Sequence, residues 1–398
     1  MRIVHIGDEH LGGAYPEKAA KSFEFLTTQL WEDQTSPAFD PDLIVSTGDL
    51  TDRPLHVHSE HLKPFLNFVK TANCPIVLLQ GTPSHEPLGA IDNIAAVSDG
   101  KIITITSPFD LHVFPESGGA VMGLPALTRP QLAKWAKQID PSLNGFEDPD
   151  AAVKLILSSI GERWKNIEGP RILTYHGVLR GCTTATGQVL AGGTLEVARE
   201  DLALANPDVV LCADIHLAQE WVTPCPVSYC GSSHPCNWGE RDQKSFTVID
   251  LNENGAIENF ERIPFPHKPM VKIDLEFTGE QFDGQWFYIE NGGRHFKVSD
   301  MLAVCIEGNE IKVSYTIPRE IAAAVDDAYI RVLFGQRGID LASVERIIKT
   351  EYRERIVGIA AMQTTAQQYE AVCMARSVDA RIGAIAKADL IDEQGVTL

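Results

Sequence analysis

Short apolar segments alternate with amphipathic segments over the first two thirds of the chain. Most of the apolar segments are rich in β-branched residues and are followed by Gly, Asp or His. This pattern is typical of strands that are buried on both faces and carry polar residues at their carboxyl ends. The amphipathic segments predict helices that cover both faces of the sheet, so we expect a layered α/β/α sandwich. The predicted strands span residues 3–6, 43–47, 76–79, 102–105, 120–123, 171–175, 209–212, 227–230 and 246–251, and the predicted helices span 18–32, 60–71, 129–138, 150–165 and 197–205.

The alternation ends at Pro264, Pro266 and Pro269. The segments beyond them predict a small α+β unit, because strand patterns surround one helix pattern, and then two amphipathic helices in the tail. We therefore predict a first domain over residues 1–265, a second over 266–355 and a helical tail over 356–398. In the α+β unit, strands are predicted at 270–277, within 301–317 and at 343–352, with a helix at 318–334; the tail helices are predicted at 362–375 and 380–392.

Composition is that of an ordinary globular protein, with 44% hydrophobic and 22% charged residues in a chain of 398. Apolar runs fall short of the ~20 residues of a membrane span, and the first residues lack the features of a signal peptide. We expect a cytoplasmic protein that does not enter a membrane.

The net charge is −20, and residues 1–265 carry 19 basic against 34 acidic side chains. A protein that binds duplex DNA by neutralising phosphates is usually basic, because counterion release supplies most of the non-specific affinity. If the substrate is nucleic acid, bound cations, a local basic patch or a partner must supply the positive field.

The eight cysteines include no CxxC pair, which argues against a disulfide framework or a zinc ribbon. The closest grouping is Cys225, Cys230 and Cys236, near His234. Their spacing matches no common metal-ligand pattern, so we expect these cysteines in the core. His234 follows a Gly-Ser-Ser turn, and a position near the functional site stays open for it.

Acidic and imidazole side chains recur where five of the predicted strands end. Ligands bind at the carboxyl ends of strands in open α/β sheets, so the five segments can converge on one site. Carboxylates mixed with imidazoles suit Mn, Fe or Zn. An Asp that bridges two cations builds a centre for in-line displacement at phosphorus. The segments are Asp8-Glu9-His10, residues 48–52 (GDLTD), residues 81–86 (GTPSHE), His176-Gly177 and Asp214-Ile215-His216.

The order of these motifs resembles that of the calcineurin-like metallophosphoesterases. Within them the chain is similar to the SbcD family of nuclease subunits, whose counterpart in other organisms is the meiotic recombination nuclease. Residues 5–12, 229–240 and 244–249 carry this resemblance, and residues 315–320 resemble the family's capping domain. The resemblance implies a four-layer α/β/β/α sandwich, followed by a small α+β capping domain and a helical tail.

Position by position, the resemblance implies Asp8, His10 and His216 on a first metal and Asp49 as a bridge between two metals. His176 would bind the second metal, and His85 would be a catalytic imidazole that assists the leaving oxygen. Glu9 and Asp52 are expected to support these residues or to cap a helix.

The chain departs from the family pattern at two positions on the second metal. Ser84 stands for the usual Asn of the third motif, and Asp214 for the first His of the fifth motif. We assign both to the second metal as ligands or near neighbours. A hydroxyl and a carboxylate favour Mn or Mg there, or binding only together with substrate phosphate.

These features predict a metal-dependent DNA phosphodiesterase with two divalent ions, most simply Mn, with Mg, Fe or Zn as alternatives. The family implies a homodimer and a partner, an SbcC-like ATPase of the SMC type, on which the tail would dock. Ordinary packing of the tail stays an alternative. Two other functions stay open, namely a metallophosphoesterase with a non-DNA substrate and a DNA-repair scaffold with weakened catalysis.

Overall fold

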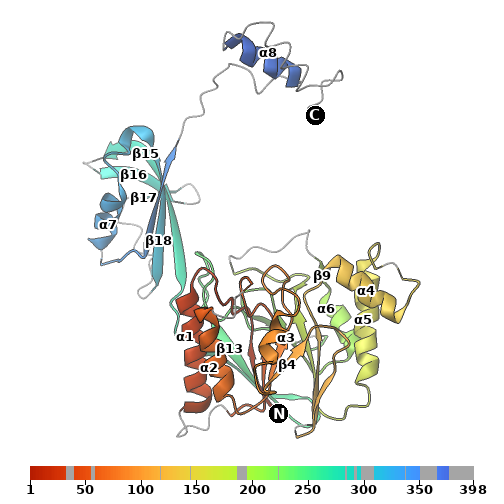
Figure 1. Cartoon of the computed structure of the whole chain (residues 1–398). Coiled ribbons are helices and arrows are strands. Elements are labelled where there is room, and N and C mark those ends of the chain that lie inside the picture. Colours follow the sequence, from red (N-terminus) through yellow and green to blue (C-terminus); the bar gives the residue numbers. More distant parts are fainter. Residues whose placement is uncertain are drawn as a thin grey trace.

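The computed structural model describes most of the chain, and Figure 1 shows its arrangement. Two sheets with flanking helices form a large first unit, and a third sheet with α7 forms a smaller second unit. The described residues are 1–32, 40–54, 59–116, 118–143, 145–185, 195–222, 224–282, 285–290, 294–296, 309–336, 338–349 and 365–375, with side chains left aside for part of 280–296 and of α8.

The first sheet has six strands in the order β14-β13-β1-β2-β3-β4. Strands β1 to β4 are parallel, so their carboxyl ends lie at one edge of the sheet, and β13 and β14 pair antiparallel beside β1. The strands span β1 Arg2–Ile6, β2 Leu43–Ser46, β3 Ile76–Leu79, β4 Ile102–Ile105, β13 Ser245–Leu251 and β14 Ile257–Pro264.

The second sheet also has six strands, in the order β11-β12-β10-β7-β6-β5. Its central strands are parallel, and the two edge strands pair antiparallel. A separate pair, β8 with β9, follows β7. The strands span β5 His112–Phe114, β6 Gly119–Leu124, β7 Arg171–His176, β8 Val178–Leu179, β9 Glu196–Val197, β10 Val209–Ala213, β11 Gln219–Trp221 and β12 Val227–Tyr229.

Three layers of hydrophobic contacts make the first unit a four-layer sandwich. Ile3 and Val45 of the first sheet pack with Leu211 of the second in a core between the sheets. Val4, one residue along from Ile3, faces the opposite way and packs in a core beneath α1 and α2. A third core lies between the second sheet and helices α4 and α5. The α/β/β/α sandwich that the family resemblance implies is therefore confirmed, whereas the α/β/α sandwich expected from the alternation alone lacks the second sheet.

Helices cover both outer faces of the sandwich and begin at local signals. A proline lies in the first turn of α1, α2, α4 and α5, where its missing N–H costs nothing. Thr128 and Asp148 cap α4 and α5 through their side chains. The helices span α1 Pro16–Thr27, α2 Lys63–Thr71, α3 Ala90–Ala95, α4 Arg129–Ile139, α5 Pro149–Arg163 and α6 Arg199–Leu202, with a π-helical turn Thr28–Glu32 after α1 and 3₁₀ turns Glu60–Leu62 and Ala203–Ala205.

The second unit is a five-stranded sheet in the order β17-β16-β15-β18-β19, packed on α7. Since β14 ends at Pro264 and β15 begins at Met270, the boundary predicted at residue 265 falls between two sheets. The domain limits themselves stay predictions. The elements span β15 Met270–Phe282, β16 Gln285–Glu290, β17 Arg294–Phe296, β18 Glu310–Pro318, a 3₁₀ turn Arg319–Ile321, α7 Asp327–Gly335 and β19 Ser343–Lys349.

Direct contacts join the two units. Lys18 of α1 donates from Nζ to Oε1 of Glu310 in β18 over 2.5 Å. The backbone N–H of Met270 donates to the carbonyl oxygen of Glu240, and the backbone N–H of Gly239 donates to the carbonyl oxygen of Met270.

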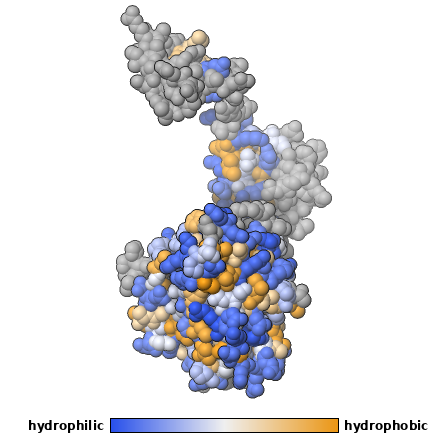
Figure 2. All heavy atoms as spheres, turned by 90° about the vertical axis from the view of Figure 1, so that its right-hand side faces the viewer, coloured by the Kyte–Doolittle hydropathy of each residue, from blue (hydrophilic) through white to orange (hydrophobic). Residues whose placement is uncertain are grey.

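On the face shown in Figure 2, hydrophilic residues cover much of the first unit, with hydrophobic residues among them.

Two predicted helices are shorter in the structure. The segment 197–205 begins as a strand because Val197 pairs with Leu179, so α6 starts only at Arg199. The segment 318–334 yields a helix only from Asp327, because the Asp326 side chain caps the N–H of Tyr329 there. In the tail, α8 spans Thr365–Ala375, whereas the helix predicted at 380–392 lies outside the described residues.

Among the described residues, no helix combines the length and apolarity that a membrane crossing requires.

Candidate metal centre

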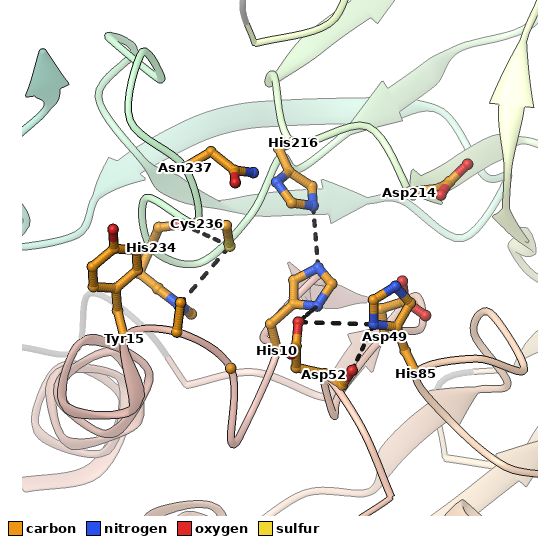
Figure 3. Close-up of a pocket in the computed structure, with 12 residues that line it drawn as sticks. His10, Tyr15, Asp49, Asp52, His85, Asp214, His216, His234, Cys236 and Asn237 are labelled. Atoms are coloured by element: carbon orange, nitrogen blue, oxygen red, sulfur yellow. Dashed lines mark hydrogen bonds and ion pairs between the residues drawn. The ribbon is translucent and has the colours of Figure 1, made fainter. Parts of the chain in front are cut away.

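The predicted site residues converge at one end of the sandwich, where the parallel strands of both sheets terminate. Asp8 and His10 follow β1, and Asp49 follows β2. His176 is the last residue of β7, and Asp214 directly follows β10. Because both sheets present their carboxyl ends here, side chains far apart in sequence line one pocket (Figure 3).

A first group of ligand atoms comes from Asp8, His10 and Asp49, which lie within 4.8 Å of one another and are all buried. His216 joins this group, because its Nε2 lies 3.1 Å from Nε2 of His10 (Figure 3). Both oxygens of Asp8 accept hydrogen bonds from the backbone N–H of Asp214, at 3.0 and 3.1 Å. Two imidazoles and two carboxylates thus face one position.

A second group comprises Asp49, His176 and Asp214, again within 4.8 Å of one another. Nε2 of His176 lies 3.4 Å from Oδ1 of Asp49 and 3.9 Å from Oδ1 of Asp214. Asp49 therefore belongs to both groups. This is the arrangement that a bridging carboxylate between two cations requires.

The backbone at these positions is unusual for residues with side chains. Asp8, His10, Asp49 and Asp214 all have positive φ, with values of 51°, 45°, 56° and 93°. Non-glycine residues enter this region at an energetic cost, and such strain concentrates at functional sites. The strand ends therefore turn sharply and direct these side chains toward the two ligand groups.

Two glycines make room for the close approach of the strands. A Cβ atom at Gly48, which has a φ of 105°, would overlap Nδ1 of His176. A Cβ atom at Gly81 would overlap the backbone nitrogen and Oδ1 of Asp49. Any side chain at either position would displace His176 or Asp49, both of which belong to the second group.

Residues 1–218 match the family model of calcineurin-like phosphoesterases. The chain belongs to this family. Its members are metal-dependent phosphoester hydrolases, which accords with the two groups of ligand atoms. Solved structures provide 45 matching chains; one is 13% identical, aligns over 66% of this chain and 98% of its own, and has a TM-score of 0.39. No curated protein matches the chain.

The residues present fit two divalent cations, the cofactors of this family. The available donors are carboxylates and imidazoles that lie close together. The charges support this fit. Burial would raise the pKa of Asp49, but His176 lowers it below the usual range. Burial would lower the pKa of His176, but the Asp49 carboxylate raises it well above its ordinary value. Asp49 and His176 thus favour each other's charged forms, and a cation between them would balance the Asp49 charge in the same way.

Each candidate histidine ligand is oriented by a partner at its other ring nitrogen. Nδ1 of His176 lies 2.7 Å from the carbonyl oxygen of Thr47 and Nδ1 of His216 lies 3.2 Å from Oε1 of Glu240. Nδ1 of His10 lies 3.3 Å from Oδ1 of Asp52. These contacts leave the Nε2 atoms pointing at the two groups, which is the usual supporting arrangement around metal-bound histidines.

His85 lies beside the first group rather than inside it. Its ring is edge-on to that of His10, with centroids 5.2 Å apart. Because a carbonyl oxygen can only accept, Nδ1 of His85 donates to the carbonyl oxygen of Asp52 over 2.8 Å. The half-buried His85 ring therefore directs Nε2 away from this bond, and it lines the pocket (Figure 3).

The hydroxyl at the second group belongs to Thr82. Oγ1 of Thr82 lies 3.2 Å from Nε2 of His176, and its backbone N–H donates to Oδ1 of Asp49 over 2.6 Å. Ser84, to which the motif alignment assigned this role, is exposed in the following turn. Gly81 is followed directly by Thr82, as Gly is followed by Asn in the family motif, and this adjacency was the signal that could have identified Thr82.

Glu9 and Glu86 are buried under the site and fix its loops. Glu9 accepts a hydrogen bond from Oγ of Ser46 at 2.9 Å. The Glu86 carboxylate accepts from the backbone N–H groups of Leu50 and Gly81, and burial raises its pKa to about 7. Glu86 thereby ties the loop after β3 to the loop that carries Asp49.

The structure also brings residues to the site that no motif identified, together with His234, for which the sequence left a position near the site open. Glu240 orients His216 and is itself held by Nζ of Lys244 at 2.8 Å. Cys236 and His234 line the pocket from the loop after β12 (Figure 3). Cys225 and Cys230 are buried away from it, as expected for core residues, whereas Cys236 departs from that expectation.

Proposed function

We propose that this protein is a metal-dependent DNA phosphodiesterase, the nuclease subunit of an SbcCD-like complex that processes DNA ends or double-strand breaks. The observation that carries the proposal is the pair of ligand groups sharing Asp49, with His85 beside them. The similarity of residues 229–240, 244–249 and 315–320 to the SbcD family supports the choice of DNA as substrate.

Two divalent cations bound to these groups would activate a water molecule and neutralise charge at phosphorus. Asp8, His10, Asp49 and His216 would hold the first, and Asp49, His176 and Asp214, with Thr82 beside them, the second. Manganese suits this mixture of oxygen and nitrogen donors. His176 would hold the second cation through Nε2 in its unprotonated form, since this atom faces that group.

His85 is placed to move a proton at the leaving oxygen. The carbonyl oxygen of Asp52 fixes Nδ1, so Nε2 is the atom that can reach substrate in the pocket. In its protonated form, Nε2 would donate to the departing 3′ or 5′ oxygen of the cleaved phosphodiester. Asp52 supports both rings, because its Oδ1 lies 3.3 Å from Nδ1 of His10 and 3.8 Å from Nδ1 of His85.

The charge of the chain supports the need for a partner. With a net charge of −20, the isolated protein has little non-specific attraction to a polyanion such as DNA. Two bound divalent cations would offset only part of this negative charge. We infer weak, salt-sensitive DNA binding by this chain alone, and tight binding in a complex with an SbcC-like ATPase of the SMC type. A homodimer and docking through the tail, which includes α8, belong to the same proposal.

A cleavage assay tests the substrate class. We expect the protein with Mn²⁺ to degrade end-labelled duplex or single-stranded DNA and to hydrolyse bis(p-nitrophenyl) phosphate, and His85→Ala to lose most of both activities. Hydrolysis of a phosphomonoester or a small nucleotide without cleavage of DNA would favour a different metallophosphoesterase. DNA binding without cleavage of any phosphoester at any metal concentration would favour a scaffold.

A further inference from the structure

Cys236 lies with two histidines of the first ligand group. Its Sγ, one ring nitrogen of His10 and one ring nitrogen of His216 lie within 4.8 Å of one another. Two ligands bound to one metal at ordinary bond lengths of about 2.0–2.3 Å can be no farther apart than about 4.6 Å, so this spacing is nearly that of a common coordination sphere. The Nε2 atoms of the two histidines already lie 3.1 Å apart.

The surroundings of Cys236 differ from those of a structural cysteine. Cys225 and Cys230 are 7% and 1% exposed and lie among core residues, whereas Cys236 is only partly buried and lines the pocket. Figure 3 shows its sulfur between the side chain of His234 and the rings of His216 and His10. The thiol therefore faces the ligand groups and not a hydrophobic core.

Hydrogen bonds hold the loop that carries Cys236 beside His216. The backbone N–H of Cys236 donates to Oε2 of Glu240 over 3.2 Å. Oε1 of the same carboxylate lies 3.2 Å from Nδ1 of His216. One carboxylate thus fixes both the His216 ring and the Cys236 backbone. Nε2 of His234 lies 3.9 Å from the sulfur and can donate a hydrogen bond to it.

We propose that Cys236 is a sulfur ligand of the first cation, alongside Asp8, His10, Asp49 and His216. This inference rests on the proposed metal centre and specifies its metal. A thiolate is a soft donor that favours Zn²⁺, Fe²⁺ or Co²⁺ over Mn²⁺, whereas carboxylate oxygens favour Mn²⁺ or Mg²⁺. The two positions then differ, because the second group offers only oxygen and imidazole donors.

Cobalt substitution reports sulfur coordination directly. The metal-stripped full-length protein is titrated with Co²⁺ through two equivalents while its absorption spectrum is recorded. We expect visible ligand-field bands from the bound ion and a near-ultraviolet sulfur-to-cobalt charge-transfer band. Cys236→Ser should keep the visible bands and lose the near-ultraviolet band. Cys74→Ser, which changes a partly buried thiol outside the pocket, should keep both.

Competition between Zn²⁺ and Mn²⁺ provides a second measurement. Cys236→Ser should lower the affinity for Zn²⁺ relative to Mn²⁺ by about tenfold or more, since even supporting residues of metal sites change affinity by 10–100-fold. Circular dichroism of the variant establishes that it is folded.

The outcomes separate the two proposals. Visible bands without a near-ultraviolet band in the unaltered protein, or a near-ultraviolet band that persists in Cys236→Ser, would overturn sulfur ligation while leaving the metal centre in place. Absence of all cobalt bands would overturn the metal centre itself, and sulfur ligation with it.

Discussion

Oε1 of Glu240 lies 3.2 Å from Nδ1 of His216, the ring nitrogen that faces away from the ligand groups. Burial alone would raise the pKa of Glu240, but this contact and the Lys244 ammonium lower it to about 2. Glu240 is therefore ionised at all ordinary pH values. A permanent carboxylate at Nδ1 fixes the tautomer and the ring orientation of His216. It also makes Nε2 more basic and therefore a better metal ligand.

The first prediction concerns this support. Glu240→Gln should weaken binding of the first cation by about 10–100-fold while leaving the fold intact. Titration of the metal-stripped protein against a chromophoric chelator measures the change. Glu220→Gln is the matched control, because Glu220 pairs with Arg262 on the surface and is outside the pocket. Equal losses in the two variants would show that Glu240 has no particular role at His216.

The second prediction separates proton transfer from metal binding. His85→Ala should lower kcat for phosphodiester cleavage by about 10²–10⁴, the usual range for a general acid, without changing the metal content. Metal analysis of the dialysed variant and kinetics at saturating Mn²⁺ provide the two numbers. His61→Ala, on the 3₁₀ turn Glu60–Leu62, is the control. Loss of metal from His85→Ala would instead make His85 a ligand.

The third prediction distinguishes two neighbouring hydroxyls. Thr82→Ala should weaken binding of the second cation and raise the Mn²⁺ concentration needed for half-maximal activity, because Oγ1 of Thr82 lies 3.2 Å from Nε2 of His176. Ser84→Ala should change neither, because Ser84 is exposed. Thr82→Ser, which retains the hydroxyl, should restore most of the affinity. The reverse result would return the role to Ser84.

The fourth prediction concerns acid stability and a histidine outside the ligand groups. His5 is fully buried between the sheets, and burial lowers its pKa to about 3, with Arg262 contributing. The unfolded chain takes up a proton near pH 6.5 and the folded chain only near pH 3, so folding stability is lost as pH falls between these values. The loss attributable to His5 is at most about 5 kcal/mol.

Urea unfolding in the presence of a chelator, at a series of pH values, measures this effect. His5→Leu should show a shallower fall in unfolding free energy below pH 6.5 than the unaltered protein, because it removes the group that must be kept neutral. Identical slopes in the two proteins would show that the acid sensitivity arises elsewhere.

The order of elements in the first unit follows from local pattern. Strands such as Ile76–Leu79 and helices such as Arg129–Ile139 were predicted nearly to the residue, because β-branched runs and proline-led amphipathic segments are local signals. Local pattern predicts a helix that starts at Val197, where the structure instead has the short strand Glu196–Val197. Its pairing with residues 178–179 is a contact distant in sequence, so local propensity could not reveal it.

The candidate site was predictable to the extent that its residues follow strands. Asp8, His10, Asp49, His176 and His216 are brought together as expected, and Asp214 joins them. In the family motif, the Asn directly precedes the histidine. Thr82 was missed because two residues of the turn separate it from His85. Cys236 and Glu240 were missed because they come from a loop with no metal-binding spacing.

The sequence by itself determined the buried strands, their polar carboxyl ends and the excess of carboxylates that calls for cations, since each depends on residue type and near neighbours. The tertiary structure decided which hydroxyl faces His176, which carboxylate supports His216, and that the sulfur of Cys236 lies beside two imidazoles. Those relationships depend on two sheets packing face to face, which brings loops that follow strands of both sheets to one end of the sandwich. Packing brings together atoms whose separation along the chain carries no signal.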